Sequence, residues 1–353
     1  MLEDSPNTIE SQQRPESQTR PVSGARMRQL DGLRGVAAIF VMLMHYTVAY
    51  DNLIGHQTPM LLKFPRGGIG VHVFFMLSGF VIFMSLDRAR NLLDFIVSRF
   101  ARLYPAYWTA LLITLLVTFR DRIPGYELSG KAIMANFTMI QGFLGFMDID
   151  PVYWTLQAEL QFYVLMGLIF GLRLRRFTDV IFAGLVVLNA IDHFISFTDW
   201  PGTGLWRFNI YLPANKLYLF LVGIVFYEMR TQTTWRHWLM LSLCLTSACI
   251  NNKSWTILGL VICGAVILLL ATRERLPILA SRWLLYLGTI SYSLYLLHQF
   301  IGYAVIKQSY HWGWNGHVGV LVAITVSILL ATAVCFGVER PINDLIKNKY
   351  RQP

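Results

Sequence analysis

Long apolar runs recur along the chain, separated by short polar segments that carry most of its lysines and arginines. A membrane-spanning helix needs about 20 mostly apolar residues, within roughly 17–25. The third run starts just before Pro105, which suits a first helical turn because that turn does not use the missing N–H donor. A further amphipathic or re-entrant helix is expected near 131–146. The pattern predicts an all-α polytopic transmembrane helix bundle of about ten spans, at 30–50, 69–87, 103–119, 152–171, 178–197, 213–229, 236–250, 254–271, 283–306 and 317–338.

The distribution of lysine and arginine predicts how this bundle is oriented. If the N-terminus is inside the cell, the inner segments hold 20 of these 30 residues and the outer segments 9, with Arg34 inside the first span. Positively charged loops stay on the cytoplasmic side, so both termini are predicted to be cytoplasmic. The expected domains are a disordered cytosolic tail at 1–28, a transmembrane domain at 29–345 and a short cytosolic tail at 346–353.

Composition excludes several other classes of protein. Only 14% of the residues are charged, against about 25% in a soluble domain. The formal charge of +10 lies between apolar runs, where it sets topology, so we expect no nucleic-acid partner. The four cysteines all lie inside apolar runs, without a CxxC pair or nearby histidines. The pattern therefore predicts neither a disulfide framework nor a metal site.

Ionisable residues inside the spans mark a candidate site, because charge is costly in hydrocarbon and is retained there for function. Arg34 and His45 lie eleven residues apart, which is about 16 Å along a helix and nearly on the same face. Glu159 and His298 fall at the same outer depth as His45 in the predicted topology. We expect His45 to act as a general base that Glu159 orients. The alternative for His45 is a packing hydrogen bond to a neighbouring helix.

A second polar cluster is expected at the inner face. Arg99 and Arg102 are three residues apart, so they share one helix face, and Arg34 lies at a similar depth. Guanidinium groups bind phosphates with two parallel hydrogen bonds. The cluster predicts a site for a phosphate-bearing donor whose reactive end reaches into the membrane. Arginines at this depth are also explained by the positive-inside rule alone.

Six motifs occur in order along these spans. They are Arg34-x10-His45, GVHVFFMLSGF at 70–80, the Arg99/Arg102 pair, WTLQAELQFY at 154–163, SYSLYLLHQ at 291–299 and VERPI at 338–342. Over about residues 28–345 the chain resembles acyltransferase family 3, a group of bacterial integral-membrane O-acyltransferases. The family often has Asp where this chain has His72, so an acidic role is not carried over to that position.

The resemblance implies transfer of an acyl group, most often acetyl, from cytosolic acyl-coenzyme A to a hydroxyl of an extracytoplasmic carbohydrate or lipid-linked glycan. It implies the bacterial cytoplasmic (inner) membrane, membrane lipids as partners, acyl-coenzyme A as co-substrate and no permanently bound cofactor. A soluble domain that some relatives carry at the C-terminus is not seen here, so a second transferase protein would perform any further step. The implied donor-binding residues are Arg34, Arg99 and Arg102, and the implied acceptor-binding residues are His72, Trp154 and His298.

Other functions remain open at this stage. A proton-coupled transporter of an anionic solute would use buried His and Glu as a proton relay and arginines to bind the anion. Secondary transporters commonly show internal repeats and polar groups at the midplane, whereas no repeat is visible here and the polar groups separate toward two faces. A non-catalytic scaffold would leave so many buried ionisable groups unexplained. Transient acylation of His45 and an aromatic-belt role for Trp154 are further alternatives.

Overall fold

The chain folds into helices joined by short connections. The structure is a computed structural model, and it describes residues 27–121, 126, 128–197, 214–252 and 254–351. No strand occurs in these ranges, which confirms the all-α prediction. Within them, five helical segments are long and apolar enough to cross a membrane: Arg28–Leu53, Ile69–Arg88, Leu92–Asp121, Trp255–Thr272 and Gly316–Tyr350. The protein is thus a multi-pass membrane protein, while the count of ten spans and the side of each terminus stay predictions.

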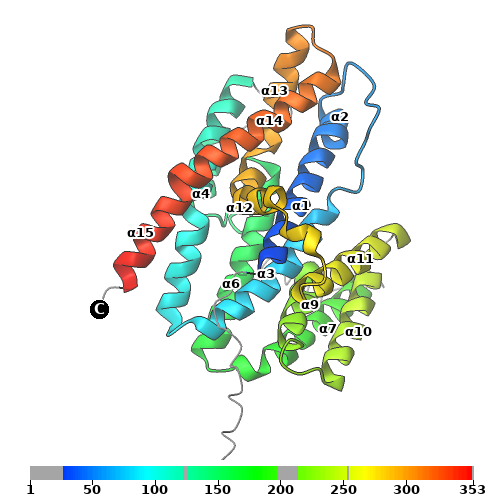
Figure 1. The fold of residues 1–353 in the computed structure, drawn as a ribbon, viewed down its shortest axis with the longest axis vertical. Helices are drawn as coiled ribbons and strands as arrows, with labels where there is room; N and C mark the ends of the chain where they lie inside the picture. The colour runs from blue at the N-terminus through cyan, green and yellow to red at the C-terminus, as the bar shows by residue number, and fades with distance from the viewer. Residues whose placement is uncertain (1–26, 122–125, 127, 198–213, 253, 352–353) are drawn as a thin grey trace, which may run out of the picture.

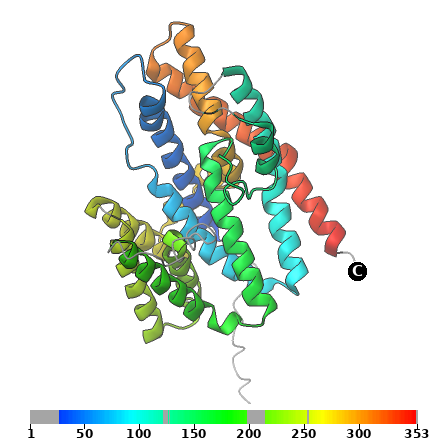
Figure 2. The ribbon, with the colours of Figure 1, turned by 180° about the vertical axis from the view of Figure 1, so that it is seen from behind.

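One group of helices forms an elongated bundle (Figure 1). Its members are α1 (Arg28–Met44), α2 (Tyr50–Leu53), α3 (Ile69–Arg88), α4 (Leu92–Asp121), α6 (Trp154–Gly171), α12 (Arg282–Leu297), α13 (Gln299–His311), α14 (Gly316–Val334) and α15 (Arg340–Arg351). Helix α1 packs along α12 and α3. Seen from behind, α6 runs down the bundle between α3 and α4 (Figure 2). The candidate site lies among these helices.

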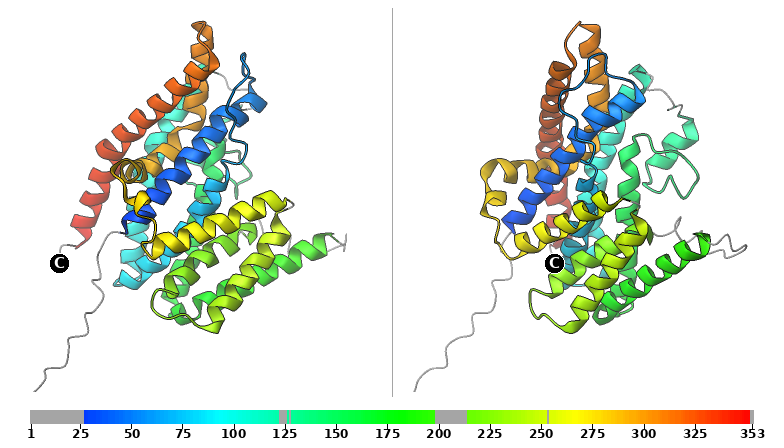
Figure 3. Two further views of the ribbon diagram at one scale, coloured as in Figure 1. Left: turned by 45° about the vertical axis from the view of Figure 1, so that its right-hand side comes forward. Right: turned by 90° about the vertical axis from the view of Figure 1, so that its right-hand side faces the viewer.

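A second group lies beside this bundle (Figure 3). It consists of α7 (Thr178–Phe197), α9 (Leu217–Glu228), α10 (Trp235–Asn251) and α11 (Trp255–Thr272). Helices α9 and α11 pack against α3. Two glycines permit the α3–α9 contact, because a Cβ at Gly79 would lie 2.1 Å from the carbonyl oxygen of Phe220, and one at Gly223 would lie 2.0 Å from that of Met76. Small residues allow such close backbone approach between membrane helices.

The third predicted span begins earlier than expected. Helix α4 starts at Leu92 rather than at 103, and the Asn91 side chain accepts a hydrogen bond from the backbone N–H of Asp94 at its first turn. Pro105 therefore lies inside the helix, and its placement in a first turn was wrong. The apolar pattern gave too late a start because Arg99 and Arg102 interrupt it, although both residues belong to the helix and are partly buried.

Two further elements differ from the prediction. The helix expected near 131–146 is only α5 (Gly130–Asn136), followed by turns that the Asn136 side chain holds through Met147 and Ile149. The span expected at 283–306 is divided at His298 into α12 and α13. At this break the backbone N–H of Phe300 donates to the buried carboxyl of Asp150. Diverting this donor to a side chain interrupts the regular helical ladder.

Candidate active site in the helix bundle

Three arginines and one glutamate line a cavity of about 100 Å³ between α1, α3, α4, α6 and α12. We call it the arginine cavity, and its polar lining is Arg34, Ser78, Arg99, Arg102, Thr155, Glu159, Tyr163, Ser291, Tyr292 and Tyr295. The expected convergence of the three arginines is therefore present. Arg34 also has Asp31 one turn away on the same helix, with 3.7 Å between Nη1 and Oδ1.

Arg102 is held by a carboxylate that sequence reasoning missed. Its Nη1 lies 2.6 Å from Oε1 of Glu339, and Ser293 donates to the other carboxylate oxygen at 2.7 Å. Glu339 ends η7 (Cys335–Glu339), a π-helical turn, and is 2% exposed. Its signal in the sequence was an acidic residue in VERPI, directly after an apolar run. The contact joins three motifs that lie far apart in the chain.

Arg99 differs from Arg102 because no described carboxylate pairs with it. Its Nη2 donates to Ser98, its guanidinium lies 5.8 Å from the ring centroids of Phe95 and Tyr163, and its buried Nε has no partner among the described residues. It also lines a neighbouring pocket with Arg88 and Lys347, which we call the basic pocket. Arg99 is thus a cation shared by two adjoining cavities and available to an anionic ligand.

Glu159 belongs to the arginine cavity and does not contact His45. Its Oε1 accepts hydrogen bonds from Ser78 at 2.9 Å and from Tyr163 at 2.6 Å. The expectation that Glu159 orients His45 is therefore corrected. Both residues lie on helices that reach a similar depth, but packing turns the Glu159 side chain toward α3 and the arginines.

A second cavity, of about 300 Å³, contains the histidine predicted to be the base. We call it the histidine cavity, and its polar and aromatic lining is His45, His72, Trp154, Lys216, Tyr295 and Gln299. Val71 and Tyr295 line both this cavity and the arginine cavity. The two cavities are therefore neighbours. His45, His72 and Trp154 come together as predicted, whereas Lys216 and Gln299 had not been singled out.

The partner of His45 is His298. His45 Nδ1 lies 3.0 Å from Nε2 of His298 and 3.0 Å from the carbonyl oxygen of Val41. His298 Nδ1 faces the carbonyl oxygens of Leu294 and Tyr295. Carbonyls only accept, so His298 carries its proton on Nδ1 and offers a lone pair on Nε2. This network assigns the His45 proton to Nδ1, where it is a donor, and leaves the His45 Nε2 lone pair free.

His45 stands at the start of a π-helical turn, η1 (His45–Ala49), inside the helix that continues from α1 to α2. A π-helical turn has i→i+5 hydrogen bonds in place of i→i+4 and is frequent at functional sites. Tyr46, the second residue of the turn, donates through its hydroxyl to the carbonyl oxygen of His298 at 2.7 Å. The turn therefore ties the helix of His45 to the break that holds His298.

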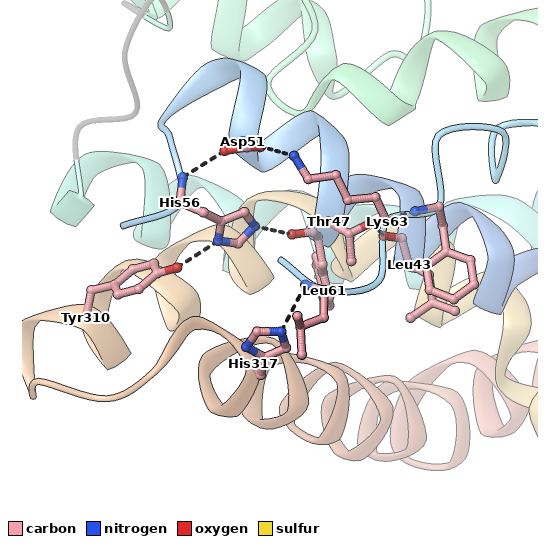
Figure 4. Close-up of polar contacts among 10 residues, drawn as sticks. Leu43, Thr47, Asp51, His56, Leu61, Lys63, Tyr310 and His317 are labelled. Carbon is pink, nitrogen blue, oxygen red and sulfur yellow. Dashed lines mark hydrogen bonds and ion pairs between the residues drawn. The ribbon is translucent and has the colours of Figure 1, made fainter. Parts of the chain in front are cut away.

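The connection at 54–68 braces this turn (Figure 4). His56 Nε2 donates to the carbonyl oxygen of Tyr46 at 2.8 Å, and His56 Nδ1 accepts from the hydroxyl of Tyr310 at 2.8 Å. Asp51 accepts from the backbone N–H of His56 and from Lys63. The carbonyl oxygen of Tyr46 thus has a side-chain donor, so it does not depend on a backbone N–H of the helix for its hydrogen bond.

Comparisons with known proteins identify the family of this chain. The acyltransferase domain family matches residues 27–340. A putative acetyltransferase, ORF330, of Acidianus two-tailed virus is 25% identical over 88% of both chains. Nodulation protein 10 of Rhizobium leguminosarum bv. viciae is 26% identical over 92% of this chain and 95% of its own. A putative peptidoglycan O-acetyltransferase, YrhL, of Bacillus subtilis is 31% identical over 40% of this chain and 24% of its own.

No solved structure matches the chain. The family match nevertheless extends over nearly all of the described helices, from the start of α1 to the start of α15. Two of these relatives, ORF330 and YrhL, are named as putative acetyltransferases. The chain therefore belongs to acyltransferase family 3, and it is a multi-pass membrane O-acyltransferase.

Proposed function

We propose that this protein moves an acyl group, acetyl by analogy with the relatives, from cytosolic acyl-coenzyme A to a hydroxyl of an extracytoplasmic carbohydrate or lipid-linked glycan. It would do so in the bacterial cytoplasmic membrane. One observation carries the proposal: the arginine cavity and the histidine cavity adjoin, with Val71 and Tyr295 in the wall of both. The anionic end of such a donor would meet the arginines of the first cavity, and its reactive end would reach His45 in the second.

The donor enters from the basic pocket. Arg88 and Lys347 line this pocket and Arg99 lines both it and the arginine cavity, so phosphate groups of coenzyme A meet cations along the way. The pantetheine arm would then pass Val71 and Tyr295. Arg34 and His45 are about 16 Å apart by helical rise, a length that an extended pantetheine arm spans. The thioester would thereby reach His45.

The chemistry is an acyl transfer with His45 as general base. His45 Nε2 takes the proton of the acceptor hydroxyl while that oxygen attacks the thioester carbonyl carbon. A new C–O bond forms, the C–S bond breaks, and the departing coenzyme A thiolate takes the proton from the His45 imidazolium. His298 holds the His45 ring through Nδ1, which fixes the tautomer that the reaction needs. Glu159, together with Tyr163, organises the arginine cavity.

The decisive experiment measures coenzyme A release. Purified protein in lipid nanodiscs is mixed with labelled acetyl-coenzyme A and a glycan acceptor, and both free coenzyme A and labelled glycan are quantified. Equal amounts of both products are expected from the wild type and neither from His45→Gln. An anion transporter would bind or move its solute without releasing coenzyme A, and that outcome would reject the proposal.

A further inference from the structure

The histidine cavity contains buried polar atoms that the protein itself leaves unused. One ring nitrogen of His72 and the side-chain oxygen of Gln299 are buried without a hydrogen-bond partner among the described residues. Both side chains line the histidine cavity beside His45. Buried polar atoms in proteins are nearly always hydrogen-bonded. Donors and acceptors gathered unused in one cavity therefore indicate a ligand rich in hydroxyl groups.

Lys216 adds a charge to the same cavity. It ends the short helix η5 (Ala214–Lys216) at the start of α9 and is only partly exposed. No carboxylate in the described part of the chain pairs with it, and no Asp or Glu lines the histidine cavity. Arg102, in the neighbouring arginine cavity, has such a partner in Glu339. An ammonium group removed from water without a counter-ion is unfavourable, so a ligand that supplies the negative charge would bind preferentially.

We propose that the acceptor is an anionic saccharide, in which a carboxylate or phosphate group next to the acylated hydroxyl binds Lys216. His72 and Gln299 bind neighbouring hydroxyls, and the exposed ring of Trp154 offers an apolar face to the sugar. The cavity of about 300 Å³ is at the lower end of the range for small-ligand pockets. This inference rests on the proposed function, because it names the substrate class of the same site.

Binding of matched sugars tests the inference without using the transfer reaction. The probes are methyl β-glucopyranoside, its uronate and its 6-phosphate, and saturation-transfer NMR on protein in nanodiscs measures their dissociation constants. The wild type should bind at least one anionic probe about tenfold more tightly than the neutral one, a difference typical of one partly buried charge contact. Preference for the uronate indicates a carboxylate-bearing acceptor, and preference for the phosphate indicates a sugar phosphate.

Three variants complete the test. Lys216→Gln should lose the anionic preference and bind the neutral probe as before, whereas Lys216→Arg should keep the preference. Lys131→Gln, at an exposed lysine of α5, should behave as wild type and serves as the control. Equal binding of all probes, no binding of any probe, or a preference that survives Lys216→Gln would overturn the inference. If coenzyme A release is absent while Lys216-dependent binding persists, the proposed reaction fails and the anion site stands.

Discussion

The ring nitrogens His45 Nδ1 and His298 Nε2 lie 3.0 Å apart, and this contact links the first motif of the chain to one near its end. His298 is almost fully buried at the break between α12 and α13. Its own Nδ1 is held by backbone carbonyls, so its Nε2 can accept the proton of His45 Nδ1. The base therefore presents its free nitrogen because a second histidine fixes its ring.

Removing the base or its partner should have different consequences. His45→Ala should lower kcat by about 10²–10⁴-fold, the usual contribution of a general base. His298→Ala should lower kcat less, and leave the KM for the donor unchanged, because it only positions the base. His298→Gln should recover part of the activity, since its amide oxygen can accept the same proton. Steady-state transfer kinetics check this, and a His298→Ala enzyme with full kcat would contradict it.

Replacing Arg99 should weaken donor binding, whereas replacing Arg102 should lower the stability of the fold. Arg99→Ala should weaken acyl-coenzyme A binding by roughly ten- to a hundredfold, because charge-assisted hydrogen bonds contribute about 1.5–3 kcal/mol. Arg99→Lys should restore binding only in part, since lysine lacks the planar fork. Calorimetric titration of the donor measures both effects. Unchanged donor binding in Arg99→Ala would mean that this residue serves topology alone.

The neighbouring Arg102 should act on folding. Arg102→Ala leaves the buried carboxylate of Glu339 unpaired, and such a loss destabilises proteins by about 3–5 kcal/mol. Combining it with Glu339→Gln should restore much of this stability, because the uncompensated charge is removed. Thermal unfolding in detergent compares the two variants with Arg99→Ala, which should unfold near the wild-type temperature. An equally stable Arg102→Ala protein would show that the pair contributes nothing.

His56 should act on the reaction although it lies outside both cavities. His56→Ala removes the donor to the Tyr46 carbonyl and should lower kcat by about tenfold through the π-helical turn that carries His45. His56→Gln keeps a donor and should be closer to wild type. The matched control is His317→Ala, because His317 accepts from the backbone of Leu61 in the same connection. A loss of similar size in the control would attribute the effect to the connection as a whole.

Helical register should matter as much as residue identity. One alanine inserted between Val36 and Met44 turns His45 by about 100° relative to Arg34, which breaks its contact with His298. We expect loss of transfer with both residues still present. An alanine inserted between Pro59 and Met60, in the 54–68 connection, should be tolerated better. Activity of the first insertion comparable to the second would remove the geometric link between Arg34 and His45.

Asp150 should make stability depend on pH. Burial raises the pKa of its carboxyl from 3.8 to about 7, so the folded protein binds this proton more tightly than the unfolded chain. Stability from this group is therefore full below about pH 4 and decreases as the pH rises toward 7. Asp150→Asn should flatten the dependence of the unfolding temperature between about pH 4 and 7. An identical pH profile in the variant would exclude this group as the cause.

Local patterns in the sequence were sufficient for some of the helices. The segments predicted at 236–250 and 254–271 coincide almost to the residue with the helices α10 (Trp235–Asn251) and α11 (Trp255–Thr272), and α11 is long and apolar enough to cross a membrane. For α11 this agreement has a physical reason, because hydrocarbon thickness sets the length of an apolar run that crosses a membrane. The spacing of Arg34 and His45 on one helix is likewise a local property.

Only the tertiary structure decided which side chains meet. The sequence predicted that Glu159 and His298 lie at the same depth as His45. Which of the two contacts His45 depends on how each helix is rotated about its axis, and packing between helices sets that rotation. In the structure His298 contacts His45, and Glu159 accepts hydrogen bonds from Ser78 and Tyr163. The pairing of Arg102 with Glu339 joins residues 237 positions apart. A pattern along one segment has no information about such a contact, because the contact arises from how separate helices pack.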